Sequence, residues 1–255
     1  MSGPHADRNI AFEAIDNFRD LGGLRTRDGG VIRGGHVFRS GDPRHMTESD
    51  YAKLTGDLGV RTILDLRRPD ELEDVGVSPL IKPPVRHVHI RLVQAHNLES
   101  VVRQTQSVGS VGAMYQQSLE DVAFGRNLTF ALELLSHEEN RPALFHCSLG
   151  KDRVGVLAAS LLAVLGVSDG DVATDYAMSA QAAQRQAELR AKNETVDSKP
   201  NWPDWVSAAP PESMQHILAF VRREFGSMEG YLQSHGGDAT LPERLRDALL
   251  DERSS

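Results

Sequence analysis

The sequence has little cysteine and few aromatic residues, and it contains no long hydrophobic run. Its 255 residues include a single cysteine, Cys147, which excludes a disulfide within the chain and most thiolate metal sites. No stretch reaches the roughly eighteen apolar residues that a membrane-spanning helix needs. Residues 1–9 carry charges and a proline instead of an apolar segment, so no secretory signal is visible and we expect a cytoplasmic protein. Export by a route that needs no signal peptide stays open.

The chain also lacks a surplus of positive charge. It has 28 lysines and arginines against 36 aspartates and glutamates, which gives a formal net charge of −8. This balance argues against a general nucleic-acid or anionic-membrane surface, so a positive field is expected only inside a pocket. The length fits one domain over residues 1–255, with residues 1–10 as a loose tail. Composition does not fix the oligomeric state.

The single cysteine lies where a short apolar run gives way to a long one. Residues 143–145 predict a buried strand, and residues 154–165 are long and apolar enough for a core helix. A loop between a strand and a helix N-terminus presents backbone N–H groups that favour an anion. A lone cysteine is more often a small buried hydrophobe, but at such a place its thiolate is stabilised. We therefore predict that Cys147 is a nucleophile.

The residues after Cys147 are of the types that bind a phosphate group. Arg153 supplies a planar, permanently charged fork that can grip two phosphate oxygens, and Gly150 permits close approach of the backbone. The predicted chemistry is transfer of a phosphoryl group to sulfur, followed by hydrolysis of the phosphocysteine. No metal or other cofactor is needed. The predicted phosphate-binding residues are Ser148, Leu149, Gly150, Lys151, Asp152 and Arg153.

The segment from His146 to Arg153 resembles the signature loop of cysteine-dependent protein tyrosine phosphatases. Its Cys-x-x-Gly-Lys-Asp-Arg form is similar to a bacterial branch of tyrosine and dual-specificity phosphatases that also act on phosphoinositides. The resemblance extends from Asn17 to about Leu250, so it covers nearly the whole chain. Further segments that are similar to this family are Asn17–Gly23, Phe38–Gly41, Asp65–Glu71 and Asp175–Ser179.

The resemblance implies an α/β fold with a short, mainly parallel central sheet flanked by helices. Residues 180–191 favour a helix, and residues 193–211 carry four prolines and two tryptophans in a long loop. We therefore expect an additional helical lid region at about residues 180–211, where Trp202 and Trp205 either face substrate or anchor the loop to the core. The implied substrate is a phosphotyrosine protein, with phosphoserine, phosphothreonine or a phosphoinositide as alternatives. A weakly active module that only binds phosphorylated partners is a further alternative. Neither nucleic acid nor stable membrane insertion is expected.

The general acid is not settled by the sequence. The leaving oxygen needs a proton, which a positioned carboxylic acid can supply. Asp152, inside the loop, ranks slightly ahead because of the family resemblance. Asp65 ends a predicted neighbouring strand, and sites collect beyond the carboxyl ends of parallel strands, so it could face the same crevice. The alternative for Asp65 is a buried ion pair with Arg67.

For two other side chains and for one pair of histidines, the sequence leaves both a functional and a structural interpretation. His146 would orient the loop and tune the thiolate, as the family suggests, or it is a satisfied core histidine. Lys151 adds a second positive charge beside the phosphate, of use for an inositol headgroup, or it is simply exposed. His87 lies on a predicted strand over residues 85–90, and His89 shares its face, but no third ligand accompanies the pair at a metal-site spacing.

One position departs from the family pattern. Related loops place serine or threonine directly after the arginine, where the hydroxyl donates to the thiolate, but this chain has Val154. We therefore predict a less stabilised thiolate and slow hydrolysis of the phosphocysteine. Val154→Thr should raise turnover by up to about tenfold, because a hydrogen bond to a charged group contributes about 1.5 kcal/mol. Burst kinetics and the pH dependence of Cys147 alkylation measure both effects; unchanged turnover with unchanged thiol titration contradicts the prediction.

Overall fold

The computed structural model describes residues 8–94, 98–193 and 203–251, and its centre is a five-stranded sheet. The strand order is β1-β2-β5-β3-β4, and within the described residues only the β1–β2 pair is antiparallel. The predicted α/β class with a short, mainly parallel sheet is confirmed. The strands are β1 (Arg19–Asp20), β2 (Val37–Ser40), β3 (Thr62–Asp65), β4 (Arg86–His89) and β5 (Ala143–His146).

The register of the sheet brings the carboxyl ends of four strands into one row. His146, the last residue of β5, pairs with Ser40 of β2 on one side and with Asp65 of β3 on the other. Asp65 in turn pairs with His89, the last residue of β4. Cys147 follows directly after this row. The sheet therefore delivers the cysteine to the edge where parallel α/β sheets form their sites.

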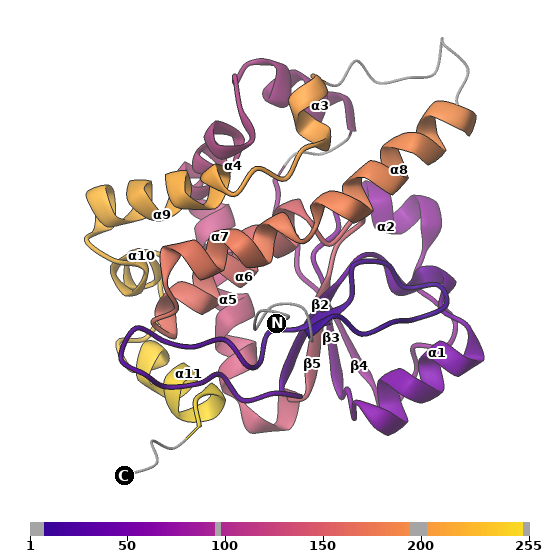
Figure 1. Cartoon of the computed structure of the whole chain (residues 1–255), viewed down its shortest axis with the longest axis horizontal. Helices are drawn as coiled ribbons and strands as arrows, with labels where there is room; N and C mark the ends of the chain where they lie inside the picture. The colour runs from indigo at the N-terminus through magenta and orange to yellow at the C-terminus, as the bar shows by residue number, and fades with distance from the viewer. Residues whose placement is uncertain (1–7, 95–97, 194–202, 252–255) are drawn as a thin grey trace, which may run out of the picture.

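The two faces of the sheet pack into two separate cores. Leu144 of β5 points into the smaller core with Phe38 and Ile63, whereas Phe145 points into the larger core with Leu64. Because β3 and β5 are buried on both faces, apolar residues follow one another directly in their sequences, without alternating with polar residues. In Figure 1 the strands lie between α1 and α2 on one side and a larger group of helices on the other.

The larger core is built mainly from helices that follow residue 110. Its central member is α6. The hydroxyl of the buried Ser160 in this helix donates a hydrogen bond to the Val156 carbonyl oxygen at 2.9 Å. Among the described residues, no helix combines the length and apolar character needed to cross a bilayer. The helices of this core are α4 (Val111–Glu120), α5 (Val122–Ser136), α6 (Asp152–Val164), α7 (Asp169–Ala177), α9 (Glu212–Phe225), α10 (Met228–Ser234) and α11 (Leu241–Leu249).

Shorter helical segments complete the fold. The one after Thr47 divides into α1 (Glu48–Ala52) and a wider π-type segment, η3 (Lys53–Asp57). Asp121 separates α4 from α5, and its carboxylate caps the first turn of α5. The other described helical segments are α2 (Pro69–Val75), α3 (Leu98–Gln106), α8 (Ala180–Asn193), η2 (Pro43–His45), η4 (Glu138–Asn140) and η6 (Asp204–Ser207).

The predicted lid region contains α8 and η6. Trp205 in η6 is partly buried and packs against the larger core, which agrees with the anchoring interpretation. Trp202 lies outside the described residues. A lid role for this region stays a prediction.

A buried carboxylate on α7 joins the N-terminal segment to the second half of the chain. Asp175 binds Arg8 at 2.8 Å, Arg19 at 3.1 Å and Arg39 at 2.6 Å, and all four side chains are buried. Burial alone would raise the pKa of Asp175, but the three guanidinium groups hold it well below its usual range. Burial and the neighbouring Arg19 lower the pKa of Arg39 to about 9. The cluster therefore depends on an ionised Asp175.

The same cluster holds the loop that follows β5. Arg39 donates to the Gly150 carbonyl oxygen at 2.9 Å. The side-chain amide of Asn17 donates to the carbonyl oxygens of Leu149 and Gly150, both at 3.0 Å. Since these carbonyls are bound from outside the loop, its backbone is fixed before any ligand arrives.

Replacing Asp175 should destabilise the protein strongly. Asp175→Asn removes the charge that compensates three buried guanidinium groups, and breaking a buried ion pair costs about 3–5 kcal/mol. Urea unfolding followed by circular dichroism measures the loss. Asp169→Asn is the matched control on the same helix, because its partners Arg27 and Arg222 are 58% and 51% exposed; we expect a loss below about 1 kcal/mol. Equal losses for both variants would contradict the role of the cluster.

Candidate active site

The loop between β5 and α6 starts at the buried Cys147 and runs into the first turn of the helix. The loop turns at Gly150, whose φ of 67° is a backbone conformation that residues with a side chain rarely adopt. A Cβ atom at this position would lie 2.4 Å from the carbonyl carbon and oxygen of Ser40, at the end of β2. Only glycine therefore lets the loop lie against the neighbouring strand.

The guanidinium of Arg153 is held by groups on both sides of the loop. Its Nη1 donates to the Leu66 carbonyl oxygen at 3.2 Å and pairs with Glu71, and its Nη2 lies 3.0 Å from the second Glu71 oxygen. Its Nη2 also donates to Ser148 Oγ at 3.2 Å. Burial would lower the pKa of Arg153, but the charges of Cys147 and Glu71 raise it, so the fork stays cationic. These contacts fix the plane of the guanidinium at the loop.

Glu71 is a site residue to which the sequence interpretation assigned no role. Its signal was only its place in the Asp65–Glu71 segment. It lies in the first turn of α2, where it accepts from the Arg68 backbone N–H at 2.7 Å and from Ser148 Oγ at 2.5 Å. Although burial would raise the pKa of Glu71, Arg153 lowers it to about 2. Glu71 is thus the ionised partner of Arg153, the predicted phosphate clamp.

Asp152 is the more accessible of the two candidate acids. Its side chain is 33% exposed, and its Oδ1 accepts from Tyr115 Oη at 2.5 Å and pairs with Lys151 Nζ at 3.0 Å. Lys151 is 1% exposed and donates to the carbonyl oxygens of Val206 and Ala208 at 2.8 and 2.9 Å. The exposed-lysine interpretation is therefore wrong. The Lys151 ammonium connects the loop to η6.

Asp65 lies in a buried ion pair. Both of its oxygens accept from Arg67, the closest pair of atoms being 2.6 Å apart, and Oδ2 is 3.1 Å from His87 Nε2. Arg67 also reaches Asp42 at 2.9 Å. Burial would raise the pKa of Asp65, but the hydrogen bond with His87, the neighbouring His146 ring and the bonds from Arg67 hold it well below its usual range. The side chain has no exposed surface, which agrees with the ion-pair interpretation.

His146 is buried beside this ion pair. Its Nε2 lies 3.7 Å from Asp65 Oδ2, and neither ring nitrogen has a hydrogen-bond partner in the described part of the chain. Burial lowers the pKa of His146, so the ring is neutral. It is not the hydrogen-bonded core histidine that was the alternative.

Asp65, His87 and His146 each offer one atom within 4.8 Å of the others, the spacing of a metal site. The carboxylate that sequence spacing did not reveal beside His87 is therefore present. However, both Asp65 oxygens already accept from Arg67, which neutralises the carboxylate. His89 points elsewhere and bonds the Arg67 carbonyl oxygen at 2.8 Å. The ion pair with Arg67 accounts for this cluster.

Val154 is fully buried in the first turn of α6 and belongs to the same core as Cys147. Its apolar side chain packs at the position where related loops have a hydroxyl. Two buried tyrosines complete the surroundings of the loop: Tyr115 Oη and Tyr176 Oη are 2.8 Å apart, and their rings meet edge to face. Both occupy apolar helix positions, so their sequence signal was that of core residues.

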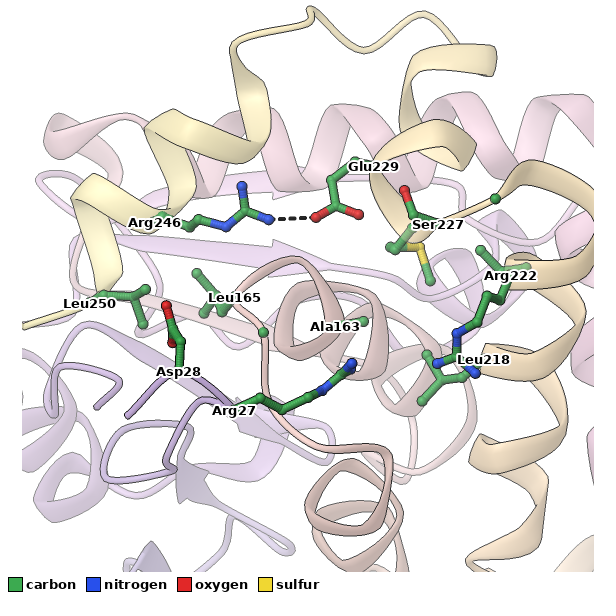
Figure 2. Close-up of a pocket in the computed structure, with 14 residues that line it drawn as sticks. Arg27, Asp28, Ala163, Leu165, Leu218, Arg222, Ser227, Glu229, Arg246 and Leu250 are labelled. Carbon is green, nitrogen blue, oxygen red and sulfur yellow. Dashed lines mark hydrogen bonds and ion pairs between the residues drawn. The ribbon is translucent and has the colours of Figure 1, made fainter. Parts of the chain in front are cut away.

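A separate hollow of about 450 Å³ lies at the other end of α6, near Ala163 and Leu165 (Figure 2). Three arginines line it, and three carboxylates balance them, because Asp28 and Glu229 also line the hollow and Asp169 pairs with two of the arginines. Arg246 pairs with Glu229 at 2.5 Å, and Arg27 and Arg222 both pair with Asp169. The hollow has no surplus charge for an anion, and the loop at the N-terminus of α6 is the site with chemistry.

Known proteins show similarity over most of the chain. The model of the tyrosine phosphatase family matches residues 10–251. A Cupriavidus necator protein named as a tyrosine-protein phosphatase is 30% identical over 176 residues, which cover 68% of this chain and 63% of that protein. A tyrosine-protein phosphatase of Nostoc commune is 28% identical, with 78% of this chain and 68% of that protein covered. The triple specificity protein phosphatase PtpB of Mycobacterium tuberculosis is 26% identical, with 92% and 96% covered.

Neutralising Glu71 should change how stability depends on pH. The folded-state pKa of about 2 lies below the ordinary 4.5, so ionised Glu71 stabilises the fold above about pH 4.5 and this contribution fades as the pH falls toward 2. Between pH 5 and pH 3, Glu71→Gln should lose about 2 kcal/mol less unfolding free energy than the parent protein. Urea titrations at both pH values test this. Glu73→Gln, at an exposed position on the same helix, should behave like the parent; equal slopes for all three proteins would refute the prediction.

Proposed function

The chain belongs to the tyrosine phosphatase family, and we propose that it hydrolyses phosphotyrosine in proteins through a phosphocysteine intermediate. The observation that carries the proposal is the loop between β5 and α6, in which Cys147 precedes the N-terminus of α6 and Arg153 is held in place by Glu71. This arrangement supplies a nucleophile, a helix N-terminus and a guanidinium cation at one point.

In the first step the Cys147 thiolate attacks phosphorus, so that the S–P bond forms and the bond to the leaving oxygen breaks. Arg153 and the loop N–H groups stabilise the charge on the other phosphoryl oxygens. The leaving oxygen takes a proton from Asp152. In the second step water attacks phosphorus, Asp152 takes up the water proton, and the S–P bond breaks to return the thiolate and inorganic phosphate.

Asp152 is favoured over Asp65 as the acid because an acid must hold its proton at the working pH. Asp65 is ionised and bound by Arg67, with no exposed surface. Asp152 lies within the loop and is 33% exposed, so a leaving group can reach it. In this assignment Asp65 supports the site through the ion pair beside His146.

Phosphotyrosine in proteins is favoured over phosphoinositides as the substrate. A headgroup with further phosphates needs additional cations beside the loop, but the Lys151 ammonium is bound by two carbonyl oxygens and by Asp152. The reaction also requires a reduced Cys147, and a reducing cytoplasm maintains free thiols. We therefore propose a cytoplasmic phosphoprotein phosphatase.

A turnover panel tests this function. Phosphotyrosine peptide, phosphoserine peptide and phosphoinositide vesicles are compared by phosphate release, with Cys147→Ser as the control. We expect the phosphotyrosine peptide to be fastest, and Cys147→Ser to lose about 10⁴-fold or more because the nucleophile is gone.

Each other outcome of the panel has a distinct meaning. Faster release from phosphoinositides overturns the substrate assignment. Tight binding of phosphotyrosine peptide without phosphate release identifies a binding module, a result for which the packing of Val154 would be the first cause to test.

A further inference from the structure

Tyr115 makes a contact with the loop that the proposed chemistry does not yet use. It lies on α4, is 2% exposed, and its hydroxyl donates to Asp152 Oδ1 at 2.5 Å. We propose that Tyr115 is a positioning residue, which orients the Asp152 carboxyl so that Oδ2 delivers the proton to the leaving oxygen. This inference rests on the proposed function, in which Asp152 is the general acid.

The contacts of Asp152 distinguish its two oxygens. The Tyr115 hydroxyl and the Lys151 ammonium, at 3.0 Å, both lie at Oδ1. No hydrogen bond to Oδ2 is made by residues 8–94, 98–193 and 203–251. A carboxylic acid carries its proton on one oxygen, and an oxygen that accepts the Tyr115 hydrogen bond and lies beside the Lys151 ammonium is the poorer place for it. The proton therefore resides on Oδ2, on a side chain that keeps a third of its surface open.

Tyr176 fixes the direction of the Tyr115 hydroxyl. A phenol has one proton to donate, and Tyr115 gives it to Asp152, so the 2.8 Å contact with Tyr176 is a bond that Tyr115 accepts. The two rings meet at 89° with centroids 6.0 Å apart, which holds both hydroxyls in place. Burial and the charge of Asp152 raise the pKa of each phenol, so both remain donors throughout the working pH range.

Helix α7 thus holds the loop at two points through adjacent residues. Asp175 binds Arg39, which holds the Gly150 carbonyl, and Tyr176 holds the hydroxyl that orients Asp152. The backbone of the loop and the acid within it are positioned by the same helix.

The orientation serves both steps of the reaction. When Oδ2 gives its proton to the leaving oxygen, the new carboxylate already accepts a hydrogen bond from Tyr115 and forms an ion pair with Lys151, both at Oδ1. These two contacts stabilise the charge until Oδ2 accepts a proton from the attacking water. The Tyr115 proton itself is not transferred.

Tyr115→Phe tests the inference because it removes the hydroxyl and keeps the ring. An acid matters more for a poor leaving group, so kcat/KM is measured with p-nitrophenyl phosphate and with phenyl phosphate. For Tyr115→Phe we expect a loss of about tenfold or more with phenyl phosphate and less than about threefold with p-nitrophenyl phosphate. Asp152→Asn should give the same pattern with a larger loss.

Tyr231→Phe is the matched control. Tyr231 is also fully buried, and its hydroxyl donates to the Leu119 carbonyl oxygen of the same helix α4 at 2.9 Å. Its loss should lower stability while leaving the ratio of the two kcat/KM values unchanged. A merely structural role of Tyr115 would give the same result as this control and would overturn the inference.

The outcomes separate the inference from the function on which it rests. An unchanged ratio in Asp152→Asn refutes Asp152 as the acid. A changed ratio in Asp152→Asn with an unchanged ratio in Tyr115→Phe refutes only the role of Tyr115. If Tyr115→Phe does not fold, Tyr176→Phe decides: a changed ratio supports the inference, and an unchanged ratio overturns it.

Discussion

The binding of three arginines by Asp175 is the interaction on which the rest of the site depends. Arg8, Arg19 and Arg39 come from the first forty residues, whereas Asp175 lies on α7, far along the chain. Without the carboxylate, buried positive charges would stand together with no compensation, an arrangement that proteins do not tolerate. With it, Arg39 reaches Gly150 and fixes the outer side of the loop. A charge pair in the protein interior therefore sets the shape of a loop at the sheet edge.

The loop carries two charged side chains, and each is held by a different partner. On one side Glu71 holds Arg153, the proposed phosphate clamp, in a plane. On the other side Tyr115 holds Asp152, the proposed general acid. Asp65, nearby, does neither; it stays ionised with Arg67. Three carboxyl groups at one sheet edge thus differ in role because their partners differ.

The sequence predicted the strand, the loop and the helix around Cys147 because their signals are local, and the roles of Cys147 and Arg153 stay predictions. Residues 143–165 carry a strand, a glycine turn and a helix in one continuous segment. The contacts that orient the site are not local: Glu71 is 82 residues from Arg153, and Tyr115 is 37 residues from Asp152. A buried tyrosine in a helix has the same pattern whether its hydroxyl is idle or bound to an acid. For that reason no sequence signal indicated the contact between Tyr115 and Asp152. The contact of the buried Lys151 with η6 was likewise not recognised.

The position of Asp175 on α7 determines when, during synthesis, the loop after β5 obtains its supporting contacts. A chain that grows from its N-terminus completes β5 and Cys147 well before α7 is made. During that interval Arg39 has no carboxylate to direct it, and the carbonyl of Gly150 lacks its anchor. Cys147 is therefore synthesised ahead of the contacts that shape its loop. The loop takes its final form only when the nascent chain is long enough for Arg39 to meet Asp175.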